Sequence, residues 1–144
     1  MGGLLCLLLG AAASPCGRWL HSASYSEALQ GVYVFGGLGS HGWLGDLHFY
    51  DLVTRSWRVL VPGPPRAAHG AAATREGLVV FGGLQGAGRL DDLQLYDGEV
   101  WRELRPQGVR PSGRYLHGTA WNGKGLFVFG GWGERRGPGE LVSE

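Results

Sequence analysis

Apolar residues occur along this chain in short runs separated by glycine-rich or polar turns. No segment sustains the 3.6-residue spacing of an amphipathic helix. The clearest runs are β-branched and aromatic, and three of them end in a glycine pair: VYVFGG, LVVFGG and LFVFGG, which finish at Gly37, Gly83 and Gly131. Such runs are typical of buried strands. The pattern predicts an all-β fold with almost no helix.

The runs belong to a repeat. Three arginines, Arg18, Arg66 and Arg114, are spaced 48 residues apart, and a histidine follows each of them three residues later. These histidines are His21, His69 and His117. Each unit is expected to hold four short strands, and we place the units at 14–61, 62–109 and 110–144, the last one partial. The expected strands are 19–26, 31–36, 47–51 and 55–60, then 67–74, 78–82, 92–97 and 100–105, then 115–121 and 125–130.

The repeated residues have physical reasons to recur. The pairs Gly36-Gly37, Gly82-Gly83 and Gly130-Gly131 allow positive φ or a close approach of two backbones. Large aromatic side chains are expected to fill the space where radially arranged sheets splay apart: Tyr50, Trp57, Tyr96 and Trp101. Asp51 and Asp97 begin turns, where a carboxylate accepts N–H bonds. The first strand of each unit is rich in small residues, as expected where strands converge on a common axis.

This arrangement resembles the kelch repeat, which places a glycine doublet after an apolar strand and then a tyrosine and a tryptophan. The resemblance covers residues 14 to 144 and includes the R-x-x-H start of each unit. It implies an incomplete kelch-type β-propeller of four-stranded antiparallel blades, because propellers close with about 4–8 blades and only two complete units are present. Gly139 corresponds to Gly45, so the chain ends inside a third strand.

An arc of two and a half blades leaves open sheet edges and an exposed apolar blade face. We expect this chain to be a fragment, a truncated isoform or an incomplete gene model of a longer propeller. The alternative is self-association that completes a ring.

Composition adds little to this picture. The formal net charge of +1 gives no indication of a nucleic-acid partner. The apolar run near the N-terminus is too short to span a membrane. Residues 1–13 read either as a signal-like leader or as an unstructured leader, so the location is cytoplasmic, or secreted if the leader is cleaved. Cys6 and Cys16 are too few for a disulfide framework.

Motifs for chemistry are weak. Residues 37–42 spell G-x-G-x-x-G, but strand-like sequence follows them where a nucleotide site needs a helix N-terminus. The three repeated histidines are expected to share a local hydrogen-bonding role rather than to bind a metal. No serine sits in a G-x-S-x-G nucleophile elbow. The sequence therefore predicts no catalytic residue, no metal and no cofactor.

Function is expected in the connections that differ between repeats, since rigid scaffolds carry binding on their loops. The candidate loops are 38–44, 84–89 and 132–138. The resemblance implies a protein-interaction module or adaptor that binds a protein or peptide. The alternatives are part of a propeller enzyme, either galactose-oxidase-like or sugar-processing, and an extracellular recognition domain. The residues best suited to binding are Trp43, Arg89, Trp132, Arg135 and Arg136.

Overall fold

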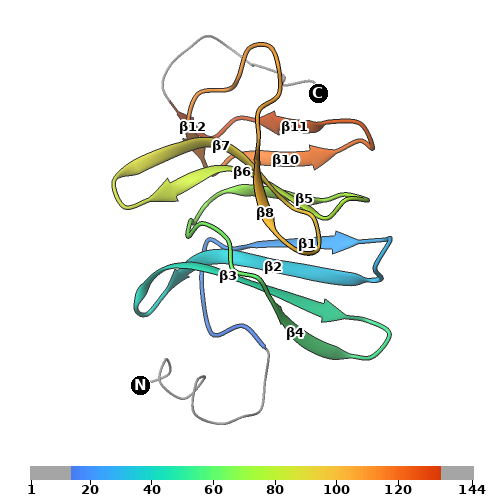
Figure 1. The fold of residues 1–144 in the computed structure, drawn as a ribbon. Coiled ribbons are helices and arrows are strands. Elements are labelled where there is room, and N and C mark those ends of the chain that lie inside the picture. The colour runs from blue at the N-terminus through green and yellow to red at the C-terminus, as the bar shows by residue number, and fades with distance from the viewer. Residues whose placement is uncertain (1–13, 134–144) are drawn as a thin grey trace.

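The computed structural model describes residues 14–133, which form two four-stranded sheets and part of a third (Figure 1). Each complete sheet is an antiparallel meander whose strands pair in chain order. Blade 1 contains β1 (Ser22–Ser26), β2 (Gly31–Gly39), β3 (Gly42–Asp51) and β4 (Ser56–Leu60). Blade 2 contains β5 (Gly70–Ala73), β6 (Leu78–Gln85), β7 (Gly88–Tyr96) and β8 (Trp101–Leu104).

The third unit repeats the inner part of this plan. Its described strands are β9 (Arg114–Tyr115), β10 (Gly118–Trp121), β11 (Leu126–Phe129) and β12 (Trp132–Gly133). The β10 strand pairs with β11, and β12 pairs with β9. We call this unit blade 3. The predicted all-β fold of four-stranded antiparallel blades is confirmed, and the blades do not close into a ring.

The core lies between successive blades rather than within one sheet. The second strands of blades 1 and 2, β2 and β6, are buried on both faces, which explains their continuous apolar sequence. Tyr33 and Phe35 of β2 pack against Leu78 and Val80 of β6, and Phe35 and Val80 are both fully buried. Side chains alternate between the two faces of β6, so Phe81 lies on the opposite face from Val80 and packs against β11 in a second cluster. Each blade therefore depends on its neighbour for burial of its apolar face.

The glycine pairs form a bulge at the end of each second strand. The register of β2 on β3 shifts between Phe35 and Gly37, and the same shift recurs in blade 2. Gly36 has φ +62° and Gly37 has φ +100°, and a Cβ at Gly37 would lie 2.7 Å from the carbonyl oxygen of Trp19. Glycine is needed here for both reasons, positive φ and close backbone approach.

Two expectations about loops were wrong. The segments 38–44 and 84–89 are mostly strand, because the β2–β3 and β6–β7 hairpins continue past the bulge. Leu38 pairs with Trp43 and Leu84 pairs with Arg89, so the turns are confined to 40–41 and 86–87. The turn that begins at Asp97 is short and is closed by a hydrogen bond from the Asp97 N–H to the Val100 carbonyl at 3.2 Å.

The N-terminal expectations lie partly outside the described residues, which do not include the leader 1–13. Cys16 is disulfide-bonded, which the cysteine count alone did not predict. Within residues 14–133 there is no helix long and apolar enough to cross a membrane.

Candidate functional site

The R-x-x-H segment of each unit contains a strained residue that joins neighbouring blades. Leu20, Ala68 and Leu116 occupy the same repeat position and have φ between 55° and 56°. Positive φ is uncommon for residues other than glycine. At these positions the backbone N–H and carbonyl groups point toward the neighbouring blades. The Ala68 N–H donates to the Leu20 carbonyl at 2.8 Å, and the Leu116 N–H donates to the Ala68 carbonyl at 2.9 Å.

Two of the three repeated arginines, Arg18 and Arg66, are buried ion-pair partners inside their own blades. Arg66 is 1% exposed, and its guanidinium donates to both oxygens of Asp92 at 2.8 and 2.7 Å. It also donates to the carbonyl of Gly82 at 3.1 Å. Arg18 makes the same bidentate contact with Asp46 at 2.6 and 2.7 Å. The arginine therefore fixes the glycine bulge and the start of the third-strand pairing together.

The ion pairs alter the titration of their carboxylates. Burial alone would raise the pKa of Asp92, but hydrogen bonds and charge from Arg66 outweigh it and lower that pKa. The same balance between burial and the contacts from Arg18 and His48 holds the pKa of Asp46 well below its usual range. Both carboxylates are therefore ionised at neutral pH.

The repeated histidines pack on the glycine pairs. A Cβ at Gly36 would lie 3.0 Å from Cε1 of His69, in the next blade. The Nε2 of His69 lies 2.8 Å from the Ser22 hydroxyl, which is a contact between blades 1 and 2. Burial, then the charge of Arg66, lowers the pKa of His69 to about 3, and burial lowers that of His117 to about 4. Both histidines are therefore neutral at physiological pH.

The repeated aromatic residues complete the interface at the rim. Trp101 of blade 2 lies 4.7 Å from the ring of Phe35 in blade 1, and its Nε1 donates to the Val61 carbonyl at 2.9 Å. Tyr96 lies 6.5 Å from Tyr33, edge to face. In blade 1, Trp57 packs on Tyr50 at 5.0 Å. The turn carboxylates behave as expected, since Asp51 and Asp97 each accept two backbone N–H bonds.

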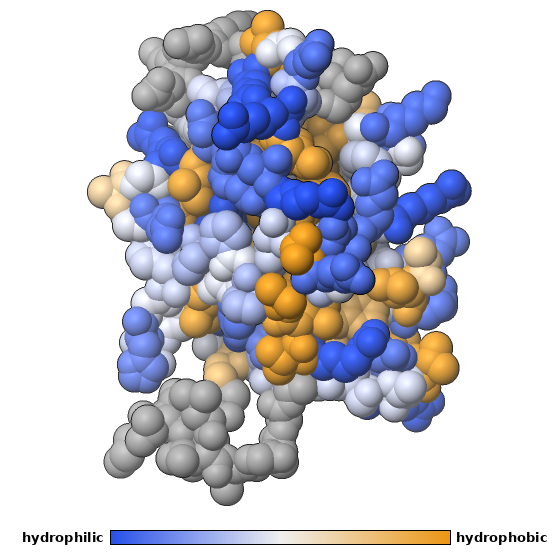
Figure 2. All heavy atoms as spheres, viewed as in Figure 1, coloured by the Kyte–Doolittle hydropathy of each residue, from blue (hydrophilic) through white to orange (hydrophobic). Residues whose placement is uncertain are grey.

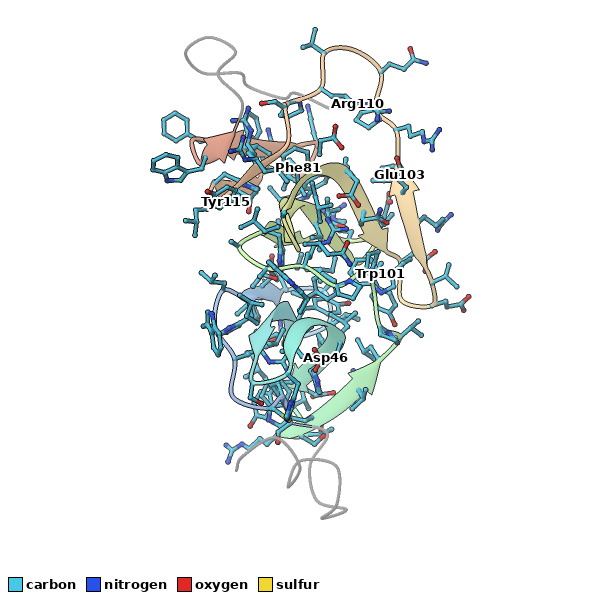
Figure 3. All side chains as sticks on the ribbon, turned by 90° about the vertical axis from the view of Figure 1, so that its left-hand side faces the viewer. Asp46, Phe81, Trp101, Glu103, Arg110 and Tyr115 are labelled. Carbon is cyan, nitrogen blue, oxygen red and sulfur yellow. The ribbon has the colours of Figure 1, made fainter. Side chains whose placement is uncertain are left out.

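One side of the blades gathers exposed apolar residues, and we call it the hairpin face. It is the side on which the β2–β3 and β6–β7 hairpins turn, and it also holds β12 and the R-x-x-H segments (Figure 1). Figure 3 looks onto this side, with Asp46, Phe81 and Tyr115 marking successive blades. The hairpin face is defined by Trp19, Leu20, Trp43, Arg89, Leu116 and Trp132.

Backbone pairing holds this face together. Trp19 bridges to Leu38, the cross-strand partner of Trp43. In blade 3, Tyr115 pairs with Trp132 in the same manner. The exposed fractions are 55% for Trp19, 41% for Leu20, 55% for Leu116 and 68% for Trp132.

The structure thus places three of the five residues proposed for binding on a shared side. Trp132 is exposed, Trp43 is half-buried and Arg89 is exposed. Arg135 and Arg136 lie outside the described residues.

A cleft of about 1130 Å³ between blades 2 and 3 was not predicted. Apolar side chains of β6, β7 and β11 line it, and charged side chains surround them. Figure 2 shows apolar atoms recessed between hydrophilic side chains in the upper half of the molecule. In the interface between blades 1 and 2, Tyr96 and Trp101 fill the corresponding space. The charged residues that line the cleft between blades 2 and 3 are Glu27, Arg75, Glu76, Asp91, Arg105, Arg110 and Lys124.

The described residues hold little that could perform chemistry. The Ser22 and His69 pair lacks the third member of a hydrolase triad, because the Nδ1 of His69 has no hydrogen-bond partner among residues 14–133. In this same part of the chain no three His, Cys, Asp or Glu side chains gather as metal ligands. The G-x-G-x-x-G segment 37–42 lies in the β2–β3 hairpin.

Two groups of residues escaped the sequence reasoning. Asp46 and Asp92, which hold the buried arginines, could have been found from their shared repeat position after each glycine pair. Trp19 and Leu116 lie beside the recognised Arg and His positions. Nothing in their residue types marked them as exposed.

Comparison with protein families agrees with this geometry. The profile of the KLHDC2/KLHL20/DRC7 Kelch-repeats domain matches residues 9–141. Kelch-repeat domains generally mediate protein–protein interaction and are typically non-enzymatic. The match covers the R-x-x-H segments, the glycine pairs and the aromatic rim positions described above, so this chain belongs to the Kelch-repeat domain family.

Proposed function

We propose that this chain is a protein-binding adaptor module that engages a partner protein or peptide through the hairpin face. The observation that carries the proposal is the exposure of Trp19, Leu20, Leu116 and Trp132 on one side of the blades. Tryptophan and arginine are the side chains most enriched among interface residues that dominate binding energy. Arg89 provides such a cation beside the apolar row.

The rigidity of the backbone beneath the face favours this role. Leu20 and Leu116 sit at the two ends of the inter-blade hydrogen-bond series, and Trp19 is held by two backbone bonds to Leu38 of 3.0 and 2.8 Å. A side chain on a fixed backbone loses less conformational freedom on binding than one on a mobile loop. The face is therefore suited to recognising a partner without rearrangement.

A comparative purification tests the proposal. Tagged wild-type chain, Trp19→Glu, Arg89→Glu and the control Val100→Glu are expressed in cells, and co-purifying proteins are quantified. Val100 is 51% exposed but lies in the turn at the opposite end of β7. We expect a partner retained by wild type and Val100→Glu and reduced about tenfold, equivalent to 1.4 kcal/mol, by both face variants. Equal recovery with all four chains would contradict the proposal.

A further inference from the structure

The three repeated arginines make the same contacts with neutral groups. The Nη1 of Arg18, Arg66 and Arg114 donates to the carbonyl of the first bulge glycine of its own blade, at 3.1, 3.1 and 3.2 Å. The Nε of each arginine donates to the carbonyl two residues earlier in the chain, at 3.1, 3.3 and 3.2 Å. These backbone contacts therefore hold all three guanidinium groups in one orientation relative to their blades.

The group that faces the guanidinium differs in blade 3. In blades 1 and 2 the Nη1 and Nη2 atoms donate to both oxygens of an aspartate, and the arginine side chains are 4% and 1% exposed. Within residues 14–133 no carboxylate forms an ion pair with Arg114, whose Nη2 donates to the Ser112 hydroxyl at 3.3 Å. Because arginine keeps its charge, this half-buried guanidinium lacks, among these residues, the compensation that its two counterparts have.

The spacing of the repeat identifies a carboxylate for this position. Asp46, Asp92 and Glu140 each lie ten residues after the first glycine of the pair in their unit. Blade 3 keeps the alignment of blades 1 and 2 up to the end of its described strands, because Trp132 pairs with the residue that follows the repeated arginine, as its counterparts do. Glu140 itself lies outside the described residues. Its side chain carries the same carboxylate as aspartate on one further methylene.

We propose that Arg114 is a carboxylate-binding site and that Glu140 of the same chain is its ligand. The carboxylate accepts two parallel hydrogen bonds from Nη1 and Nη2, the arrangement in which arginine binds carboxylates most strongly. An acidic side chain of a partner protein offers the same chemistry and is the other source that the experiments distinguish. Because Arg114 pairs with Gly133 in the β9–β12 ladder, the occupied site also stabilises the strand that carries Trp132.

A double-mutant cycle in the full chain tests this proposal by urea denaturation followed by tryptophan fluorescence. The cycle compares wild type, Arg114→Gln, Glu140→Gln and the double variant. The second substitution should add little once the first has removed the pair, so we expect a coupling of about tenfold in the unfolding equilibrium constant. This size lies between those of exposed and buried ion pairs, because the Arg114 residue is half-buried.

Control cycles separate a specific pair from a general loss of charge. Arg110→Gln combined with Glu140→Gln should be additive, since Arg110 is an exposed arginine in the connection before β9. Arg114→Gln combined with Glu134→Gln should also be additive, since Glu134 does not share the repeat position of the two aspartates. Arg114→Lys keeps the charge but loses the planar fork, so its cycle with Glu140→Gln should still show coupling. The lysine cycle carries the test if Arg114→Gln does not fold.

Recovery of the partner in the comparative purification distinguishes the two sources of the carboxylate. Coupling between Arg114 and Glu140 assigns the carboxylate to this chain. It belongs to the partner if the changes are additive and Arg114→Gln, at wild-type stability, loses the partner at least about tenfold while Glu140→Gln retains it. Any other additive result would overturn the carboxylate site. The stability cycle needs no binding partner, so its failure is distinct from failure of the proposed function in the Trp19→Glu comparison.

Discussion

Replacing Asp92 by asparagine removes the charge that compensates a buried arginine while keeping the size of the side chain. The Arg66 guanidinium is 1% exposed and makes two hydrogen bonds to Asp92, whose side chain is 23% exposed. The guanidinium cannot lose its proton, so in the variant it stays charged inside the blade. Its remaining contacts are neutral carbonyls, of Gly82 at 3.1 Å and Pro64 at 3.3 Å.

The expected cost follows from the burial of this pair. Removing one partner of a buried ion pair costs about 3–5 kcal/mol, because the other charge is left uncompensated. The asparagine carbonyl can still accept one bond, so we expect the lower end, about 3 kcal/mol. That is a large part of the roughly 5–15 kcal/mol that holds a domain folded.

Urea denaturation followed by tryptophan fluorescence measures this cost. With a urea slope of about 1–3 kcal/mol/M, the midpoint should fall by about 1–3 M. Asp91→Asn is the matched control, because Asp91 is the exposed neighbour of Asp92 in β7. Midpoints that fall equally in the two variants, or a shift below about 0.5 kcal/mol for Asp92→Asn, would refute the assignment of Arg66 as a buried, paired charge.

Three further predictions concern the repeated histidine, tryptophan and glycine positions. The unfolded state binds a proton at the His69 position near pH 6.5 and the folded state only near pH 3, so His69 alone should lower stability by about 2 kcal/mol at pH 5, within a fall between pH 6.5 and 4 to which His117 also contributes. His69→Gln should reduce this slope, without abolishing it, in denaturation curves collected across that range, and an unchanged slope would exclude the assignment. Trp101→Ala should cost about 3 kcal/mol in the same assay, whereas Trp132→Ala, at a 68% exposed site, should cost under about 0.5 kcal/mol. Gly37→Ala should destabilise more than Gly42→Ala by at least about 1 kcal/mol, because both have positive φ but only Gly37 approaches a backbone carbonyl; equal losses would contradict the close approach.

The blade plan could be read from the sequence because its signals recur in register. The glycine pairs, the aromatic positions and the turn aspartates each satisfy a local requirement, of backbone freedom, rim volume or N–H pairing, that those residue types are suited to meet. The second strands of blades 1 and 2 were predicted for a similar reason, since burial of β2 and β6 on both faces leaves continuous apolar runs.

The missed features depend on partners distant in the chain. Leu20, Ala68 and Leu116 adopt positive φ although none is glycine, and the hydrogen bonds that accompany this strain come from the neighbouring blade. The hairpins extend past the glycine bulge because cross-strand pairing resumes at Leu38 and Leu84. Neither effect can be predicted from the local structural preferences of the residues involved.

The exposed apolar row of the candidate site was also hidden from the sequence. Trp19 shares its repeat position with Ala67, which is fully buried, so the same position is interior in one blade and surface in another. Whether this repeat position is buried or exposed depends on the number and order of the packed blades. Trp43, Arg89 and Trp132 were proposed from the sequence because they lie where the repeats differ, and their role in binding stays a prediction.

Site-specific photo-cross-linking in cells tests the protein-binding role most directly. A benzophenone amino acid is placed at position 19 on the hairpin face, or at position 100 in the β7–β8 turn; the native side chains there are 55% and 51% exposed. Binding through the hairpin face predicts a discrete adduct with a second, different protein from position 19 and none from position 100. No such adduct from position 19, or equal adducts from both positions, would contradict it.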